Sequence, residues 1–270
     1  MIESRNHFTI GDASQVNGPE VNCWIFDPPY NIGYKYGAVR DDLEWSEYEA
    51  LIRESVKNMA KHTKEGHLWM INYAVQSARL LEVIEAEGWV LHQWLTWTYP
   101  TNVGHSESRF TKASRAILWF TKGTPYFDVR ATIQPYKNPN DRRIKQKMAE
   151  GNMGTAHYDH WMINLRKNDS KGYRSWFNQL PIDLVSRIIQ TCTQKGDVVG
   201  DLMAGSGTTL EVAGPLLRGV WLNDLDENAM EHWQTLESDF NQNNIPEHLL
   251  ELHSTTYPDL WYFDHTLVTK

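Results

Sequence analysis

The stretch that decides the fold runs from residue 198 to residue 224 and reads VVGDLMAGSGTTLEVAGPLLRGVWLND. Its first residues are rich in valine and predict a buried strand, and the small residues from Met203 to Gly207 predict a tight loop. A helix is predicted from Thr208 to Leu217, followed by a second strand that ends at Asp224. A strand, a crossover helix and a second strand predict a parallel βαβ unit.

The loop of this unit has the features of a cofactor site. Small residues let the backbone approach a ligand, and the helix that begins at Thr208 presents free N–H groups. Asp224 is placed to accept hydrogen bonds from ribose hydroxyls, and Asp201 to accept from a cofactor ammonium. A tight structural turn is the alternative for Gly205-x-Gly207 alone. The third glycine of a dinucleotide fingerprint is missing, and the absent Gly-Lys-Ser/Thr excludes a P-loop.

Outward from this unit, strand-like and helix-like segments alternate. The predicted strands are 7–10, 21–26, 68–73, 89–97 and 116–120, and the predicted helices are 46–62, 75–87 and 181–192. This order predicts an α/β fold, namely a Rossmann-like, mostly parallel sheet with helices on both faces. Ligands of such sheets bind at the carboxyl ends of the strands.

A second motif, Asp27-Pro28-Pro29-Tyr30, stands where the predicted strand 21–26 ends. Two consecutive prolines donate no backbone hydrogen bond and interrupt both strand and helix. A carboxylate, a free proline carbonyl and an aromatic ring suit a planar substrate with an NH2 group, because the oxygens accept the amine protons and Tyr30 stacks on the plane. A proline-stiffened surface turn is the alternative for this motif alone.

Together the two motifs resemble those of the S-adenosylmethionine-dependent DNA amino-methyltransferases. That family combines an Asp-Pro-Pro-Tyr catalytic motif with a Phe-x-Gly-x-Gly cofactor motif, which residues 201–209 match with Met203 in place of Phe. The catalytic motif comes first, as in the β group, where a target-recognition region lies between the motifs. The resemblance spans most of residues 8–230 and implies a class I methyltransferase fold with S-adenosyl-L-methionine as cofactor. We expect the tips at Asp27 and Gly205 to belong to neighbouring strands.

The resemblance also implies the roles of individual residues. Gly11-Asp12 is similar to the turn that faces the adenine of the cofactor, and Asn178-Gln179-Leu180-Pro181 is similar to the segment over its methionine end, although the family often has Lys where Leu180 stands. The predicted catalytic residues are Asp27, Pro28, Pro29 and Tyr30. The predicted cofactor-binding residues are Asp12, Ala13, Asp27, Asn178, Gln179, Asp201, Met203, Ala204, Gly205, Ser206, Gly207, Thr208, Thr209 and Asp224.

Charge is distributed unevenly along the 270 residues, whose formal net charge is −8. Residues 101–174 hold 14 basic and 6 acidic side chains, net +8, and the remainder holds 12 basic and 28 acidic ones, net −16. One basic segment on an acidic scaffold suits a polyanion bound at a single face, and a solvated charged loop is the alternative. The predicted DNA-binding residues are Lys137, Arg142, Arg143, Lys145, Lys147, Arg166 and Lys167.

We therefore divide the chain into three parts. Residues 1–124 and 176–240 form the catalytic and cofactor-binding domain, 125–175 form an inserted basic target-recognition region, and 241–270 form an extension of unknown role. The insertion shows no clean hydrophobic period, so no helix or strand is predicted within it.

The resemblance implies methyl transfer to the N6 amine of adenine in double-stranded DNA after base flipping. Family members with Asp at the first motif position mostly modify adenine, whereas Ser is commoner in cytosine-N4 enzymes. N4-cytosine methylation, adenine methylation of RNA and a non-catalytic nucleic-acid-binding protein are the alternatives. A homodimer and a restriction endonuclease partner are further possibilities.

Composition predicts a soluble, intracellular protein, and the resemblance implies a protein of bacterial or phage type. No run of about 18 apolar residues is present, and the N-terminus has no apolar signal core. Cys23 and Cys192 are expected to be buried thiols, and His157 and His160 lack the neighbouring ligands of a metal site, so no metal is predicted.

Overall fold

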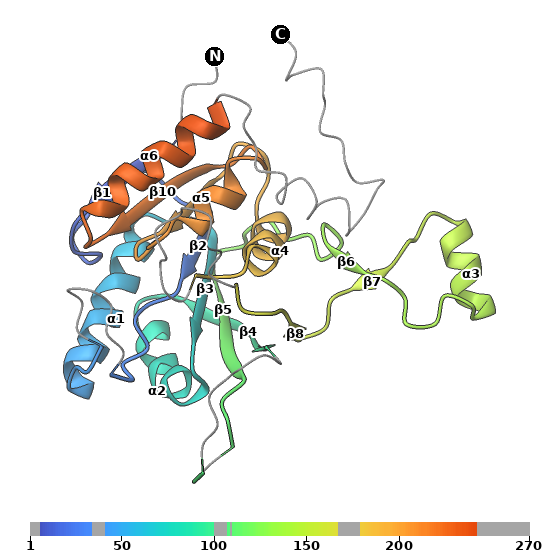
Figure 1. The fold of residues 1–270 in the computed structure, drawn as a ribbon, viewed down its shortest axis with the longest axis horizontal. Helices are drawn as coiled ribbons and strands as arrows, with labels where there is room; N and C mark the ends of the chain where they lie inside the picture. Colours follow the sequence, from blue (N-terminus) through green and yellow to red (C-terminus); the bar gives the residue numbers. More distant parts are fainter. Residues whose placement is uncertain (1–5, 34–40, 100–106, 109, 167–178, 242–270) are drawn as a thin grey trace.

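A single sheet organises the computed structural model, which describes residues 6–33, 41–99, 107–108, 110–166 and 179–241 (Figure 1). Its strand order is β1-β10-β9-β2-β3-β5-β4-β8. The strands are β1 (His7–Ile10), β2 (Cys23–Phe26), β3 (Gly66–Asn72), β4 (Val90–Thr98), β5 (Ser114–Lys122), β8 (His160–Met162), β9 (Val198–Asp201) and β10 (Gly219–Asp224). The prediction of a mostly parallel α/β sheet is confirmed, since β1, β10, β9, β2 and β3 all run parallel.

One strand runs against the others, which the sequence did not indicate. β5 is antiparallel to both of its neighbours, β3 and β4. Its first residues therefore lie at the edge where β3 and β4 end: Ala116 pairs with Asn72, and Arg115 pairs with Trp97. The start of β5 therefore lies at the same edge of the sheet as the ends of β3 and β4.

Helices cover both faces of the sheet. They are α1 (Trp45–Lys61), α2 (Ala74–Glu85), α4 (Ile182–Cys192), α5 (Thr208–Ala213) and α6 (Asn228–Asn241). Every residue of β2 and β3 is buried, which explains their continuous apolar runs. Alternate side chains face opposite layers, so that Ile25 packs with α4, α5 and α6, and Trp24 packs with α1 and α2.

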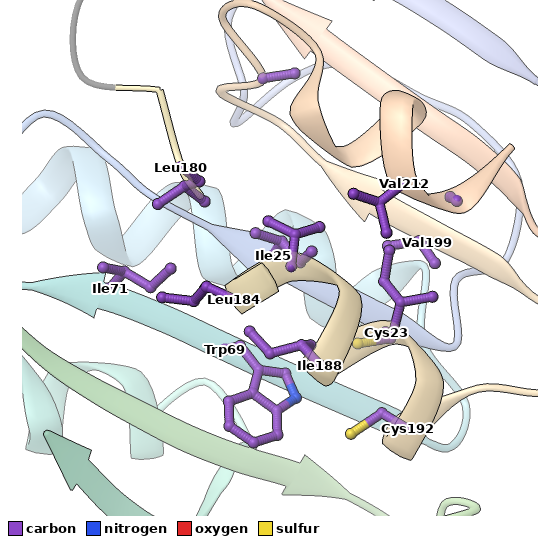
Figure 2. Close-up of a cluster of buried hydrophobic side chains, with 14 of the residues drawn as sticks. Cys23, Ile25, Trp69, Ile71, Leu180, Leu184, Ile188, Cys192, Val199 and Val212 are labelled. Carbon is purple, nitrogen blue, oxygen red and sulfur yellow. The ribbon is translucent and has the colours of Figure 1, made fainter. Parts of the chain in front are cut away.

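Helix α4 shows how this packing follows from the sequence. Leu184, Ile188 and Cys192 recur every fourth residue and lie on one face, against β2, which carries Cys23 and Ile25 (Figure 2). Full burial of such an aliphatic side chain stabilises the fold by about 1.5–3 kcal/mol. Both cysteines are free and buried, as predicted, and burial raises the pKa of the Cys23 thiol.

Helix α5 ends earlier than predicted, at Ala213 instead of Leu217. Pro215 lacks the N–H group that would bond to the carbonyl of Glu211, so the helix cannot continue regularly. None of the helices in the described ranges is long and apolar enough to cross a membrane.

An arm, residues 133–156, projects from the sheet (Figure 1). It consists of the antiparallel pair β6 (Ile133–Gln134) and β7 (Thr155–Ala156) with α3 (Arg142–Ala149) between them. No helix was predicted here, and the Asp141 carboxylate caps α3 by accepting from the Arg143 N–H at 2.8 Å. α3 buries none of its residues, and its eight residues, with Ile144 and Met148 one turn apart, are too short a run to predict a helix. β8, also within 125–175, pairs with β4 in the main sheet.

Candidate active site

Four loops leave the sheet at the same edge because β1, β10, β9 and β2 are neighbouring parallel strands. β2 pairs directly with β9, with Trp24 opposite Gly200. The Asp-Pro-Pro-Tyr motif follows β2 and the glycine loop follows β9. The expectation that Asp27 and Gly205 extend neighbouring strands is therefore confirmed.

The glycine loop has backbone angles that other residues rarely adopt. Gly205 has φ 49° and Gly207 has φ 76°, both in the left-handed region. The Gly205 N–H donates to Asp224 Oδ2 at 2.8 Å, and Trp233 Nε1 donates to the Gly205 carbonyl at 3.1 Å. β10 and α6 thus hold the loop in place. A Cβ built at Gly205 would meet no atom within 4 Å, so the loop is open at this point.

Asp201 lies beneath the loop with its carboxylate buried. It accepts hydrogen bonds from Thr209 Oγ1 at 2.7 Å and from the Met203 N–H at 3.2 Å. Its pKa is raised to about 7, chiefly by burial and also by the nearby carboxylates of Asp27 and Asp224, against the lowering effect of these two hydrogen bonds. Three acidic groups around an open glycine loop suit a ligand that carries positive charge.

The proline motif is held rigidly beside this loop. Tyr48 donates its hydroxyl to the Pro29 carbonyl at 2.7 Å, and Tyr30 donates its hydroxyl to Asp27 Oδ1 at 2.6 Å. Within the described part of the chain, no group donates to the Pro28 carbonyl. The Tyr30 ring is only 2% exposed, and it lies edge-on to Tyr73 with 5.2 Å between ring centroids.

Arg115 is the residue at this edge that sequence reasoning missed. Its guanidinium lies 4.7 Å from the centre of the Tyr30 ring, and its side chain is buried. Burial raises the pKa of Asp27 to about 6, while Arg115 and the Tyr30 hydroxyl act to lower it. The available signal was a single arginine at the head of the apolar run from Ala116 to Phe120.

The remaining predicted cofactor residues lie at the same edge where the structure describes them. Asp12 follows β1, and its Oδ1 accepts from the Ser14 N–H at 2.8 Å and from the Ser14 hydroxyl at 2.7 Å. Ala13 is buried, and its carbonyl accepts from Asn58 at 2.9 Å. Gln179 lies two residues before Pro181, the N-cap of α4, whereas Asn178 lies outside the described residues.

The predicted DNA-binding residues fall into two groups. Lys137, Arg142, Arg143, Lys145 and Lys147 are all exposed and belong to the arm. Arg166 is instead half-buried and forms a two-point ion pair with Glu211 of α5, with N–O distances of 2.6 and 3.0 Å. Lys167 lies outside the described residues.

Comparison with known proteins decides the family. The family model described as DNA methylase, of the N6/N4 type, matches residues 21–235, which include both motifs. This chain belongs to the DNA methylase family. The predicted resemblance to the amino-methyltransferases is therefore confirmed.

Similar curated proteins are named as methyltransferases. The methylase is 24% identical over 241 residues to the type II methyltransferase M1.MboII of Moraxella bovis, covering 80% of this chain and 88% of that protein. It is 25% identical over 229 residues to the type II methyltransferase M.HpaI of Haemophilus parainfluenzae, covering 82% of this chain and 69% of that protein.

Solved structures share the fold. The cytosine-N4-specific PvuII DNA methyltransferase superposes with a TM-score of 0.66 at 18% identity, covering 93% of this chain and 94% of that one. The complex of M1.HpyAVI with S-adenosylmethionine gives a TM-score of 0.61 at 15% identity, covering 85% of this chain and 98% of that one.

The DNA methylase uses S-adenosylmethionine to methylate an exocyclic amine of DNA. The residues at the sheet edge fit this cofactor, which carries a sulfonium and an ammonium group. The opening at Gly205 leaves room for it, and the carboxyl groups of Asp201, Asp27 and Asp224 lie close to one another there.

Proposed function

We propose that this DNA methylase methylates N6 of adenine in double-stranded DNA, with Asp27 and the Pro28 carbonyl as acceptors for the two amine protons. The observation that carries the proposal is the position of these two acceptors directly after β2, the neighbour of the strand that leads into the glycine loop. No described group donates to the Pro28 carbonyl. Bound S-adenosylmethionine supplies an electrophilic methyl group.

Hydrogen bonds to the two acceptors should increase the weak nucleophilicity of the amine. Its lone pair is delocalised into the base, and hydrogen bonds from both protons to Asp27 and Pro28 favour a pyramidal nitrogen with a localised lone pair. As the new N–C bond forms and the bond between methyl and sulfur breaks, Asp27 receives the proton that leaves the nitrogen. A carboxylate whose pKa burial raises to about 6 is suited to accept it near neutral pH.

The target base has to leave the duplex, at a cost of a few kcal/mol. Tyr30 is the proposed stacking partner of the flipped base. Because its hydroxyl is bonded to Asp27 and its ring is 2% exposed, the incoming amine has to replace that hydroxyl as the partner of Asp27. Base entry and rearrangement of Tyr30 are therefore coupled steps in this proposal.

DNA contacts are assigned to the arm. α3 presents Arg142, Arg143, Lys145 and Lys147 as exposed side chains on an element that projects from the catalytic sheet (Figure 1). These cations suit the phosphate backbone, which supplies binding without sequence information. The names of the curated relatives support a restriction endonuclease as functional partner. The homodimer stays a prediction.

N4-cytosine methylation is the second candidate, because the PvuII enzyme is cytosine-specific and superposes over most of this chain. Both bases offer an amine on a six-membered ring, so the same acceptors serve either. The Asp at position 27 favours adenine by its resemblance to adenine-specific members.

A product analysis tests the assignment. Purified protein and S-adenosylmethionine with a labelled methyl group are incubated with duplex DNA of diverse sequence, and in parallel with structured RNA. The nucleosides are then separated, and the modified positions are mapped by sequencing. We expect N6-methyladenine in the DNA; N4-methylcytosine without N6-methyladenine, or label in RNA alone, contradicts the proposal.

A further inference from the structure

Arg115 lies in a cage of aromatic side chains next to the catalytic motif. Its guanidinium carbon is 4.7 Å from the ring centre of Tyr30, 5.0 Å from that of Trp97, 5.5 Å from that of Tyr99 and 5.7 Å from that of Tyr73. The residue is 6% exposed. Its Nε is buried and has no hydrogen-bond partner among the described residues. A guanidinium stacks favourably on aromatic rings, which compensates in part for its lost hydration.

The charge of Arg115 acts on Asp27. Arginine stays protonated, and the surrounding phenols and the Asp27 carboxylate raise its pKa further against the effect of burial. The reversed direction of β5 brings this cation to the edge where β2 ends. No residue of β2 itself supplies a positive charge there.

The other groups that face Asp27 do not replace Arg115. Asp201 on β9 is a buried carboxyl group and supplies no positive charge, and on the motif itself the Tyr30 hydroxyl donates one hydrogen bond. Tyr73 after β3 and Tyr99 after β4 are phenols that contact the guanidinium. Lys112, before β5, lies 4.3 Å from the ring centre of Tyr73 and does not contribute to the pKa shift of Asp27.

We propose that Arg115 is a positioning residue for methyl transfer: from its aromatic cage it keeps Asp27 ionised and holds the Tyr30 ring beside it. The inference rests on the proposed role of Asp27 as proton acceptor. A protonated Asp27 would donate a hydrogen bond instead of accepting one, and the amine would lose the partner that localises its lone pair. Burial favours that inactive form, and Arg115 opposes it.

The pH dependence of methylation tests this role. Single-turnover rates are measured between about pH 5 and 9 at saturating S-adenosylmethionine and DNA, for wild type, Arg115→Gln and Arg115→Lys. Removal of the charge should move the acid limb of the Arg115→Gln profile upward by about 1–3 pH units, the size that a neighbouring opposite charge produces. Arg115→Lys keeps the charge and should keep the limb near that of wild type.

Lys112→Gln is the matched control, because it removes a cation from the same aromatic cluster and should leave the acid limb in place. A folded Arg115→Gln variant whose limb coincides with that of wild type overturns the proposal. Equal shifts in Arg115→Gln and Arg115→Lys also overturn it, since they indicate a role in packing alone.

A second measurement covers the case in which Arg115→Gln does not fold. A protonated Asp27 would give an infrared carbonyl band. Any such band in the wild-type protein is assigned to Asp27 if it is missing from Asp27→Asn. Without a neighbouring cation, burial would keep this carboxyl protonated, so absence of the band at about pH 7.5 supports the proposal and its presence contradicts it. An active Asp27→Ala variant would instead show that Asp27 is not the proton acceptor. That result would contradict the proposed function, whereas the outcomes above contradict only the role of Arg115.

Discussion

The two glycines of the cofactor loop offer a matched pair of substitutions. A Cβ at Gly207 would lie 2.7 Å from Cδ1 and 2.9 Å from Nε1 of Trp233, whose ring is fully buried and bonded to the Gly205 carbonyl. A Cβ at Gly205 would meet nothing within 4 Å. Both residues are in the left-handed region, so the two alanine variants share a backbone cost and differ in packing.

The cost of each substitution follows from these contacts. A left-handed backbone costs a residue with a Cβ about 1–2 kcal/mol, and overpacking adds about 1–3 kcal/mol. Gly207→Ala should therefore lower the free energy of unfolding by about 2–5 kcal/mol, and Gly205→Ala by about 1–2 kcal/mol. The empty space at Gly205 is where the cofactor is expected, so an added methyl group should weaken S-adenosylmethionine binding there by about tenfold or more.

Urea unfolding and isothermal titration calorimetry with S-adenosylmethionine measure the two effects separately. Gly205→Ala should combine a small loss of stability with a large loss of affinity. Wild-type affinity in this variant would refute the placement of the cofactor, and equal stability of the two variants would refute the packing argument at Trp233.

Two further predictions concern charge. Since burial raises the pKa of Asp201 from 3.8 to about 7, the stability that its proton contributes is fully present below about pH 4 and is lost as the pH rises through about 7; Asp201→Asn should remove this part of the pH profile of urea unfolding, and an unchanged profile contradicts it. Replacing Arg142 and Arg143 with Gln should lower the salt slope of DNA binding by about 2 with S-adenosylmethionine affinity intact, and Lys57→Gln on α1 is the control; unchanged DNA affinity at every salt concentration counts against the arm.

Much of the fold was predictable because burial dictates the pattern. β2 and β3 are buried on both faces and read as continuous apolar runs, and the glycine loop requires residues without a Cβ. α3 was not predictable in this way because it is only eight residues long and buries none of them.

Part of the catalytic edge could also be predicted, from the order of strands and helices along the chain. Asp27 and Gly205 follow parallel strands, and alternation of strands and helices was enough to bring them together. Arg115 belongs to the site only because β5 runs antiparallel, and strand direction is set by the connection and not by the residues of the strand. The position of Arg115 at the head of an apolar run was the one local signal, and it does not reveal the direction of the strand.

The central claim is that Asp27 acts as the proton acceptor at a site shared with the glycine loop. Its most direct test is the single-turnover rate of N6-methyladenine formation by a folded Asp27→Ala variant saturated with S-adenosylmethionine and duplex DNA. Loss of a positioned proton acceptor should slow methylation by about 100-fold to 10,000-fold without a comparable loss of cofactor affinity. Methylation at the wild-type rate would contradict the account.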